Sequence, residues 1–481
     1  MKLLPLAVTA LVGTLIAFGS TEATAGSPSV ELWVTKLSDS ADGNCSETDC
    51  SLREAIITAN DYAGTKPVYV HMLAGVQVLS LKTNDPDTPQ YGDLDVTKDV
   101  TIYGDPTLPT VIDANGIDRI LEINCTSACL VHLAFATLRD GNSPQGMAVL
   151  VNSGRLSLGS VTLANNRGLG GALNVGGGAS AIVDLSTIRN NESVGTSGEA
   201  GGGILNAGTL DVLRTTISGN TALDAGGGIA NFGTLTVEAS TISGNRAPEG
   251  VSFGGGVYQN FRATSATIRG STIVNNEALT GAGIHGHGSV SIDNTIVALN
   301  VGDDCAGSVI TFGNNIDSDG TCNLETAQGD IIAVDPKIGP LRNNGWFTRT
   351  HALLAGSPAL ENADTADCLA YDQRNVTRPQ GAICDIGAYE ARYCYGKPET
   401  RLGTESAETI EGTANADVIL GLGGNDTLRG REGNDRLCGG AGDDVLVGGL
   451  GDDRLNGGPN DDSCTGNAGS DLFAACETTI P

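Results

Sequence analysis

The sequence is poor in aromatic and in basic residues. Aromatic side chains make up only 4% of the 481 residues, and 27 lysines and arginines stand against 56 aspartates and glutamates, for a net charge of −29. Because phosphate backbones repel such a charge, we expect no nucleic-acid partner. The excess of carboxylates instead suits divalent cations and a soluble extracellular surface.

Several motifs of catalysis and nucleotide binding are also missing. The sequence contains no G-x-S-x-G nucleophile elbow, no H-E-x-x-H zinc helix and no G-x-x-x-x-G-K-[ST] phosphate loop. No apolar run after the first 25 residues is long enough to span a bilayer, so we expect no transmembrane segment after signal cleavage.

The N-terminus has the pattern of an export signal. Lys2 precedes an apolar stretch over residues 3–18, and the small residues 23–25 form a cleavage site. A membrane anchor is the alternative, but Pro5 interrupts a stretch that is already short for a span. We therefore predict a signal peptide over residues 1–25 and a protein that is secreted, extracellular or at the cell surface.

Glycine is abundant, at 68 residues, and part of it belongs to a nine-residue repeat near the C-terminus. Each repeat has a glycine-rich loop that ends in an aspartate, as in GGAGDDVLV, and in most repeats an apolar residue follows two positions later. The aspartates of the row are Asp417, Asp426, Asp435, Asp444, Asp453, Asp462 and Asp471. This period and chemistry predict a coil held together by Ca²⁺.

Residues 138–300 carry a second repeat, with a period of roughly 25 residues. Its clearest copies are 201–222 and 226–247, in which short alternating runs are separated by glycine triplets and S-G-N corners. Alternation indicates strands with one buried face, and strands this short need stacked neighbours. We predict a right-handed parallel β-helix with these apolar anchors: Leu138, Leu163, Ile188, Ile217, Ile242, Ile273 and Ile296.

An asparagine follows each of the later anchors. The row is Asn166, Asn191, Asn220, Asn245, Asn276 and Asn300. These amides are either ligand groups or an internal ladder, and we favour the ladder, because buried backbone at each corner needs hydrogen-bond partners.

Two further sets of polar residues are candidates for catalysis. Asp184, Arg214, Glu238, Arg269 and Asp293 fall at nearly the same offset before successive anchors, so they form either salt-bridged rungs or a catalytic or sugar-binding strip. His285 and His287 project to the same side of one strand and are either a metal or base pair or ordinary surface histidines. We favour the structural interpretation of both sets.

The 12 cysteines are an even number in an exported chain, which predicts disulfides. Zinc is disfavoured, because the spacings differ and no histidine lies near. The neighbours Cys45/Cys50, Cys125/Cys129, Cys305/Cys322 and Cys368/Cys384 are expected to pair locally. Cys394, Cys438, Cys464 and Cys476 then allow three connectivities, of which we prefer Cys394–Cys438 with Cys464–Cys476.

Two segments resemble known secreted proteins. The motif C-S-L-R-E-A-I-x-x-A-N within residues 42–60 resembles the entry cap of bacterial β-helix proteins with a CSLREA domain. Residues 335–390 resemble the closing segment of the same group, sometimes described as having a choice-of-anchor domain. The resemblance implies a capped β-helix with a short helix from Leu52 to Ala59, for which Ser51 is the N-cap.

Residues 403–474 resemble the repeats of the RTX, or hemolysin-type calcium-binding, family. Membership implies a β-roll with these inward residues: Ile419, Leu428, Leu437, Leu446, Leu455, Cys464 and Phe473. It implies calcium between loops two units apart, first at Asp426/Asp444, Asp435/Asp453 and Asp444/Asp462, then at the outer Asp417/Asp435 and Asp453/Asp471. Gly424, Gly433, Gly442 and Gly451 let the loop carbonyls turn toward the ion.

The predicted fold class is thus all-β, a right-handed parallel β-helix solenoid followed by a calcium-bound parallel β-roll. We expect a signal peptide at 1–25, the β-helix at 28–395 and the RTX β-roll at 396–481. The first functional hypothesis is a monomeric, non-enzymatic protein for adhesion or for binding a polysaccharide or cell-surface glycan. The alternative is a polysaccharide lyase, epimerase or glycosidase, which needs a groove where Arg214 or Arg269, a carboxylate and His285 converge.

Overall fold

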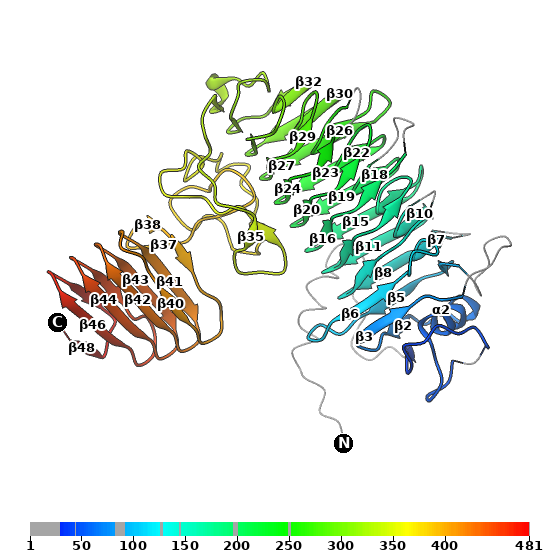
Figure 1. The fold of residues 1–481 in the computed structure, drawn as a ribbon, viewed down its shortest axis with the longest axis horizontal. Helices are drawn as coiled ribbons and strands as arrows, with labels where there is room; N and C mark the ends of the chain where they lie inside the picture. The colour runs from blue at the N-terminus through cyan, green and yellow to red at the C-terminus, as the bar shows by residue number, and fades with distance from the viewer. Residues whose placement is uncertain are drawn as a thin grey trace.

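The computed structural model describes residues 29–43, 45–81, 92–125, 128–143, 146–195, 201–248 and 252–480, and the predicted signal peptide lies outside them. Strands of successive coils pair in parallel and build two stacks, a long β-helix and a shorter β-roll at the C-terminus (Figure 1). The predicted fold class is therefore confirmed as a parallel β-helix followed by a parallel β-roll.

Three sheets form the β-helix. The largest has 18 strands: β1 (Val30–Trp33), β2 (Val68–His71), β4 (Leu94–Val96), β5 (Val100–Tyr103), β7 (Leu121–Asn124), β8 (Leu130–Ala134), β10 (Val149–Ser153), β11 (Arg155–Gly159), β14 (Leu173–Val175), β15 (Ser180–Asp184), β18 (Ile204–Asn206), β19 (Thr209–Leu213), β22 (Ile229–Asn231), β23 (Thr234–Glu238), β26 (Val257–Gln259), β27 (Ser265–Arg269), β30 (Ile284–Asp293) and β32 (Cys305–Thr311). The second has 11 strands: β3 (Gly75–Val78), β6 (Thr110–Asp113), β9 (Thr137–Arg139), β12 (Thr162–Ala164), β16 (Thr187–Arg189), β20 (Thr216–Ser218), β24 (Thr241–Ser243), β28 (Thr272–Val274), β31 (Ile296–Ala298), β33 (Ile316–Asp317) and β34 (Ile331–Ile332). The third has five: β13 (Arg167–Gly168), β17 (Glu192–Ser193), β21 (Thr221–Ala222), β25 (Arg246–Ala247) and β29 (Glu277–Ala278).

The alternation read from the sequence places one face of each strand in the core. Leu156 of β11 pairs in register with Ala181 of β15, and Ala181 pairs with Leu210 of β19. All three are buried. Because a strand of three to five residues buries too little surface alone, the core is continuous from coil to coil and stability is shared between neighbours.

The predicted anchors stack as expected, apart from the last. Ile242 of β24 pairs with Ile273 of β28, but Ile273 then pairs with Val297 of β31, so the predicted anchor Ile296 is wrong by one residue. Ile296 faces the opposite side and packs with the chain that follows the β-helix. Residues 296 and 297 are both apolar, so the pattern alone does not distinguish the residue that faces inward, and only the register with β28 does.

The asparagine row forms an internal ladder, as predicted. Each Nδ2 donates to the Oδ1 of the next asparagine, over 2.8 Å from Asn166 to Asn191 and 3.0 Å from Asn276 to Asn300. Asn300 ends the row by donating to Asp304 over 2.8 Å. A second ladder, which we did not predict, joins Asn206, Asn231 and Gln259. These amides serve the fold and are engaged with one another.

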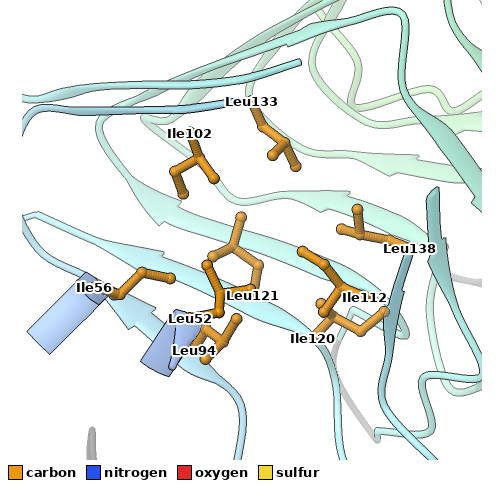
Figure 2. A pocket seen from close by; sticks show the side chains of 9 residues that line it. All are labelled: Leu52, Ile56, Leu94, Ile102, Ile112, Ile120, Leu121, Leu133 and Leu138. Carbon is orange, nitrogen blue, oxygen red and sulfur yellow. The ribbon is translucent and has the colours of Figure 1, made fainter. Parts of the chain in front are cut away.

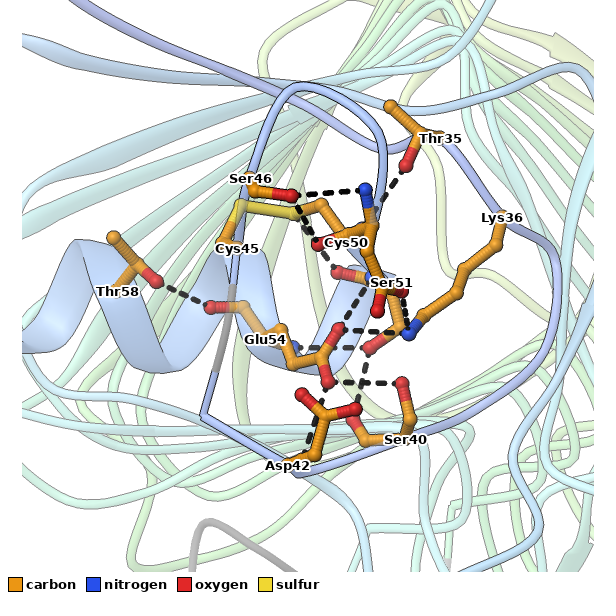
Figure 3. Close-up of a disulfide and its surroundings, with 11 residues drawn as sticks. Thr35, Lys36, Ser40, Asp42, Cys45, Ser46, Cys50, Ser51, Glu54 and Thr58 are labelled. Atoms are coloured by element: carbon orange, nitrogen blue, oxygen red, sulfur yellow. Dashed lines mark hydrogen bonds and ion pairs between the residues drawn. A yellow bond between two sulfur atoms is a disulfide. The ribbon is translucent and has the colours of Figure 1, made fainter.

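The first coil is covered by α2 (Leu52–Asp61), whose N-cap is Ser51. Ser51 Oγ accepts the backbone N–H of Glu54 over 3.2 Å, and the Glu54 carboxylate accepts the N–H of Ser51 over 2.8 Å, which completes a capping box beside the Cys45–Cys50 disulfide (Figure 3). Arg53 is fully buried and donates to Asp39 and to the carbonyls of residues 92 and 93. The charged pair in the S-L-R-E-A motif therefore ties the cap to the first coils.

Residues 335–390 close the β-helix along its side. They include the hairpin β35 (Arg342–Asn343) and β36 (Arg349–Thr350), and they contact the outer face of the 11-stranded sheet. Thr216 donates to the carbonyl of Arg349 over 2.6 Å, and Thr241 donates to Gln373 over 2.5 Å. We call these residues the closing segment.

The tail is built from two five-stranded parallel sheets. One contains β39 (Arg401–Leu402), β41 (Val418–Gly423), β43 (Arg436–Ala441), β45 (Arg454–Asn456) and β47 (Leu472–Ala474). The other contains β40 (Thr409–Glu411), β42 (Thr427–Glu432), β44 (Val445–Leu450), β46 (Ser463–Ala468) and β48 (Thr478–Ile480). The predicted inward residues from Ile419 to Cys464 have no exposed surface, and Phe473 is partly buried against them.

Six disulfides tie the chain, and they join the cysteines in the pairs that we preferred. The local pairs are Cys45–Cys50, Cys125–Cys129, Cys305–Cys322 and Cys368–Cys384. Cys394, in the hairpin of β37 (Tyr393–Cys394) and β38 (Lys397–Pro398), is bonded to Cys438 in the tail, and Cys464 is bonded to Cys476. The first of these two clamps the linker onto the β-roll.

Among the described residues, no helix is long and apolar enough to cross a membrane.

The ionised state of Glu54 stabilises the N-terminal cap. Burial disfavours the charge, but hydrogen bonds from Ser51, Ser40 and the N–H of Asp42 outweigh it and lower the pKa of Glu54 to about 2. Its stabilisation is therefore present above the usual pKa of about 4.5 and is lost as the pH falls toward 2. We predict that Glu54→Ala lowers the free energy of opening of α2 by about 2 kcal/mol at pH 7, measured by hydrogen exchange. The exposed Glu47→Ala is the control, and equal effects of the two would contradict the assignment.

Candidate calcium sites and the charged face of the β-helix

The tail aspartates lie in two rows, one at each edge of the β-roll. Asp417, Asp435, Asp453 and Asp471 form one row, and Asp426, Asp444 and Asp462 form the other. In both rows the backbone N–H of one aspartate donates to Oδ1 of the aspartate 18 residues later, over 2.7 to 3.0 Å. The parallel strand register imposes this spacing, because two nine-residue units complete one coil.

The second carboxylate oxygen, Oδ2, differs from Oδ1 in having no hydrogen-bond donor in the described part of the chain in five of these aspartates. Oδ2 is buried and has no hydrogen-bond partner among the described residues at Asp426, Asp435, Asp444, Asp453 and Asp462. These five residues are at most 2% exposed. A buried, unpaired carboxylate oxygen costs several kcal/mol, so five of them in two stacked rows call for a positive partner.

Glycines let these carboxylates lie close against the backbone of the loops. A Cβ built on Gly430, Gly439, Gly448 or Gly457 would overlap Oδ2 of the aspartate five residues later. The predicted loop glycines Gly424, Gly433, Gly442 and Gly451 lie one or two residues before an aspartate and have positive φ, for example 127° at Gly442. The loops thus need glycine where each carboxylate lies against the backbone and where the chain turns with positive φ.

The electrostatics of the rows are unfavourable without a cation. Burial, followed by the charges of Asp453 and Asp417, raises the pKa of Asp435 to about 6. Burial, followed by Asp426 and Asp462, raises the pKa of Asp444 to about 6. Asp435 and Asp444 therefore resist ionisation first because they are buried, and second because of the charges above and below them.

These residues fit calcium. The ion takes six to eight oxygen ligands, and the rows offer carboxylates with backbone carbonyls from glycine loops. Within the predicted pairs Asp426/Asp444, Asp435/Asp453 and Asp444/Asp462, both members carry an orphaned oxygen. When bound, the ion neutralises the stacked carboxylates, while the chain positions them through the Oδ1 hydrogen bonds.

Asp417 differs from the inner aspartates. Its Oδ2 accepts the N–H and the hydroxyl of Thr413 over 2.6 and 2.8 Å, and its Oδ1 accepts the hydroxyl of Thr400 over 3.0 Å. Arg401 lies 3.6 Å from the same carboxylate. Protein donors already satisfy Asp417, so the Asp417/Asp435 pair offers a cation less than the inner pairs do.

The charged row of the β-helix is paired internally. Four of the predicted residues lie in register, namely Asp184, Glu238, Arg269 and Asp293. On β19 the residue in this row is Leu213, and Arg214 is its neighbour. Arg214 still reaches back to Asp184 over 2.5 Å, and Arg269 bonds Asp293 over 3.3 Å. The carboxylate of Glu238 lies 3.7 Å from Arg269.

The closing segment covers part of this row. Arg214 donates to the side chain of Asn375 over 2.8 Å, and Arg269 donates to the carbonyl of Asp367 over 3.3 Å. Both guanidinium groups are therefore engaged at the contact between the β-helix and the closing segment, as rungs of an ion-pair ladder.

The two histidines do not join this row. His285 and Asp293 are eight residues apart on β30, which is roughly 25 Å of extended chain. His285 is buried beside Phe253 and Tyr258, so its assignment as a surface histidine is wrong, whereas His287 is exposed as expected. Burial and the neighbouring His287 lower the pKa of His285 to about 4, which leaves a neutral ring within an aromatic cluster.

A small cavity lies inside the first coils. It has a volume of about 10 Å³ and is lined only by leucine and isoleucine side chains, which point toward one another in Figure 2. Leu52 and Ile56 of α2 contribute to the lining. The cavity is large enough for about one water molecule but offers it no polar partner, so it is a packing gap under the cap and cannot hold a sugar.

An aromatic row on the outer face of the first coils was not predicted. Trp33, His71 and Tyr103 are in register on β1, β2 and β5, with ring centroids 4.0 Å apart in the first pair and 5.9 Å in the second. Tyr69 stacks on Tyr103 at 6.1 Å, and His132 contacts Tyr103 at 6.3 Å. The alternation of these strands showed only which residues face outward, and three of the rings are separated by more than 30 residues in sequence.

Comparison with known proteins concerns the tail and the fold. The family described as RTX calcium-binding nonapeptide repeat (4 copies) matches residues 402–437 and 439–473. The tail thus contains RTX repeats, whose ligand is Ca²⁺. No curated protein matches the chain. Among solved structures, the crystal structure of pectate lyase Pel9A aligns at a TM-score of 0.41 and 12% identity, covering 76% of this chain and 98% of that one.

Removing calcium should make the tail sensitive to pH. Because the pKa values of Asp435 and Asp444 are raised to about 6 from 3.8, the metal-free roll is stable below pH 4 and loses stability as the pH rises through 6. We predict that chelator at pH 7 removes the hydrogen-exchange protection of β41 to β46, and that millimolar calcium restores it. Full protection at pH 7 in chelator would contradict this coupling.

Gly439→Ala tests whether calcium binding depends on the Asp444 carboxylate lying against the backbone at Gly439. The added Cβ overlaps Oδ2 of Asp444 in the folded roll. We predict a roughly ten-fold loss of calcium affinity at the affected site, measured by calorimetric titration of the full chain. Gly177→Ala is the matched control, because the nearest atom to its Cβ is 4.0 Å away. Unchanged calcium affinity of the Gly439→Ala variant would contradict a role for the Asp444 carboxylate in calcium binding.

Proposed function

We propose that this chain is a secreted, calcium-stabilised β-helix protein that binds a neutral polysaccharide outside the cell without cleaving it. The proposal divides the chain into a signal peptide at 1–25, a β-helix at 28–395 and an RTX β-roll at 396–481. Six disulfides and RTX repeats support the extracellular location. Disulfides need an oxidising compartment, and the repeats need a compartment rich in calcium. The CSLREA resemblance of residues 42–60 adds a capped, secreted β-helix to this picture.

Calcium has a structural task in this proposal. We assign ions to the pairs Asp426/Asp444, Asp435/Asp453 and Asp444/Asp462, and to Asp453/Asp471 at the outer loop. Without an ion the stacked charges oppose folding, so the roll forms after export, where calcium is abundant. The hairpin at Cys394 and the Cys394–Cys438 disulfide then hold the roll against the closing segment.

The aromatic row carries the binding proposal. Trp33 is 60% exposed and lies on the edge strand β1, stacked on His71 at an interplanar angle of 10°. Exposed aromatic surface with polar neighbours marks a binding site, and pyranose rings present C–H groups that pack on aromatic rings. Glu31 accepts a hydrogen bond from Nε2 of His71 over 2.6 Å and supplies a polar edge for sugar hydroxyls.

The charge of the chain selects the kind of glycan. A net charge of −29, with Glu31 at the row itself, repels uronic-acid or sulfated polymers. A neutral glycan avoids this repulsion and satisfies the hydroxyl-binding groups. The charged row around Arg214 offers no comparable surface, because its guanidinium groups bond Asp184 and Asn375.

Trp33→Ala should weaken glycan binding. We predict a roughly ten-fold weaker association with neutral polysaccharides in affinity gel electrophoresis, because the substitution removes the most exposed ring of the row. Phe261→Ala, which removes a ring that is 68% exposed elsewhere on the β-helix, should bind as the wild type does. Equal retention of both variants would sink the assignment to this row, and new reducing ends would show that the protein cleaves the glycan.

A further inference from the structure

The second aspartate row follows a strict rule along the β-roll. The N–H of Asp426 donates to Oδ1 of Asp444 over 2.8 Å, and the N–H of Asp444 donates to Oδ1 of Asp462 over 2.7 Å. The residue after the second aspartate returns a bond, so Val445 donates to the carbonyl of Asp426 and Ser463 to that of Asp444, both over 2.8 Å. Each coil is thus joined to the next by one backbone and one carboxylate hydrogen bond at this edge.

The same hydrogen-bond pattern continues past the last repeat, where a glutamate outside the repeat takes the place of the next aspartate. Eighteen residues after Asp462 stands Ile480, which has no carboxylate. The N–H of Asp462 instead donates to Oε2 of Glu477 over 2.7 Å, and Thr478 donates to the carbonyl of Asp462 over 3.0 Å. Glu477 therefore takes the place of the next aspartate at a separation of 15 residues, and it lies beyond the matched RTX repeats.

A disulfide holds this shortened coil in place. Cys464 is fully buried in the core of the roll, two residues after Asp462, and it is bonded to Cys476, the residue directly before Glu477. The strands beyond the bond stay in register, with Ser463 of β46 opposite Thr478 of β48. The covalent bond thus fixes the backbone of residue 477 above Asp462, although the loop is three residues shorter than in the other coils.

Asp462 carries the same demand for a cation as the aspartates before it. It is 2% exposed, and its Oδ2 is buried without a hydrogen-bond partner in the described part of the chain. A Cβ on Gly457 would overlap this oxygen, so the carboxylate lies against the backbone at Gly457 as it does in the preceding coils. One oxygen of the Glu477 carboxylate already accepts the N–H of Asp462. The second oxygen of that carboxylate therefore also lies close to Asp462.

We propose that Asp462 and Glu477 bind one further calcium ion, and that the Cys464–Cys476 disulfide is required to form this site. The inference rests on calcium binding by the inner aspartate pairs and extends it to a residue outside the nine-residue repeat. Reduction of the bond releases Glu477 and opens the end of the roll.

Glu477→Gln in the full-length protein tests the ligand. Glutamine keeps an oxygen that can accept the N–H of Asp462 but loses the negative charge and one carboxylate oxygen, which weakens calcium binding. We expect calorimetric titration to show one ion fewer than in the wild type, and hydrogen exchange to show lost protection of β48 at saturating calcium, with β41 to β44 unchanged. Glu411→Gln removes an exposed carboxylate of the same roll, which pairs with Arg431, and should keep every ion.

The disulfide is tested by the double variant Cys464→Ser/Cys476→Ser. We expect it to lose the same single ion and the same protection of β48 while the inner sites still bind. The proposal is overturned if Glu477→Gln binds as many ions as Glu411→Gln, or if β48 stays protected in both variants. A wild-type protein that binds no calcium at all would overturn the proposed function as well, so the two failures are distinguishable.

Discussion

Each coil of this protein takes the hydrogen-bond partners of its backbone and of its inward polar side chains from the coils above and below. The asparagine ladder satisfies this constraint by itself, because an amide both donates and accepts, as from Asn166 to Asn191. A carboxylate only accepts. In the tail, five aspartates therefore use one oxygen for the N–H of a neighbour and leave the other without a donor among the described residues. The β-helix can close its ladder with protein atoms, whereas the β-roll needs a cation.

A stack of coils also has two ends, where the partners run out. At the first coil, α2 covers the core, and its buried Arg53 bonds the carbonyls of residues 92 and 93. The asparagine row ends on Asp304, which accepts from both Asn300 and Ser318. The closing segment then continues along the side of the 11-stranded sheet, where Gln373 bonds Thr216 and Thr241. The ends are thus built from irregular chain whose polar groups replace those of a missing coil.

The closing segment and the N-terminal cap determine which outer faces of the β-helix remain exposed. The closing segment lies against the charged row, and so the long ion-pair ladder around Arg214 and Arg269 becomes part of an internal contact. The first coils keep their outer face, and there Trp33 lies at the free edge of the sheet. A surface for recognition is therefore found near the N-terminal cap, far along the chain from the calcium-binding tail, whose task is to fold and to remain folded.

Repeated positions could be predicted from the sequence because the same interaction recurs at a fixed spacing. The buried anchors, the asparagine ladder, the inward residues of the roll and the cap of α2 all follow from local patterns of this kind. Positions where two adjacent residues both fit the pattern could not be predicted in this way. Ile296 and Arg214 were each displaced by one residue, because only the register of the strands shows which of two neighbours faces a given side. His285 was misplaced for another reason, since Phe253 from a different coil covers it.

The sequence by itself determined that this chain forms two parallel stacks, that the second binds calcium and that its cysteines are oxidised, because period, glycine and acidic residues act locally. Only the tertiary structure decided which groups meet across coils. It brought Trp33, His71 and Tyr103 into one row from three distant strands, and it placed Glu477 over Asp462 at a spacing that breaks the repeat. Stacking acts between coils, so it joins residues according to register, and register depends on every loop that lies between them.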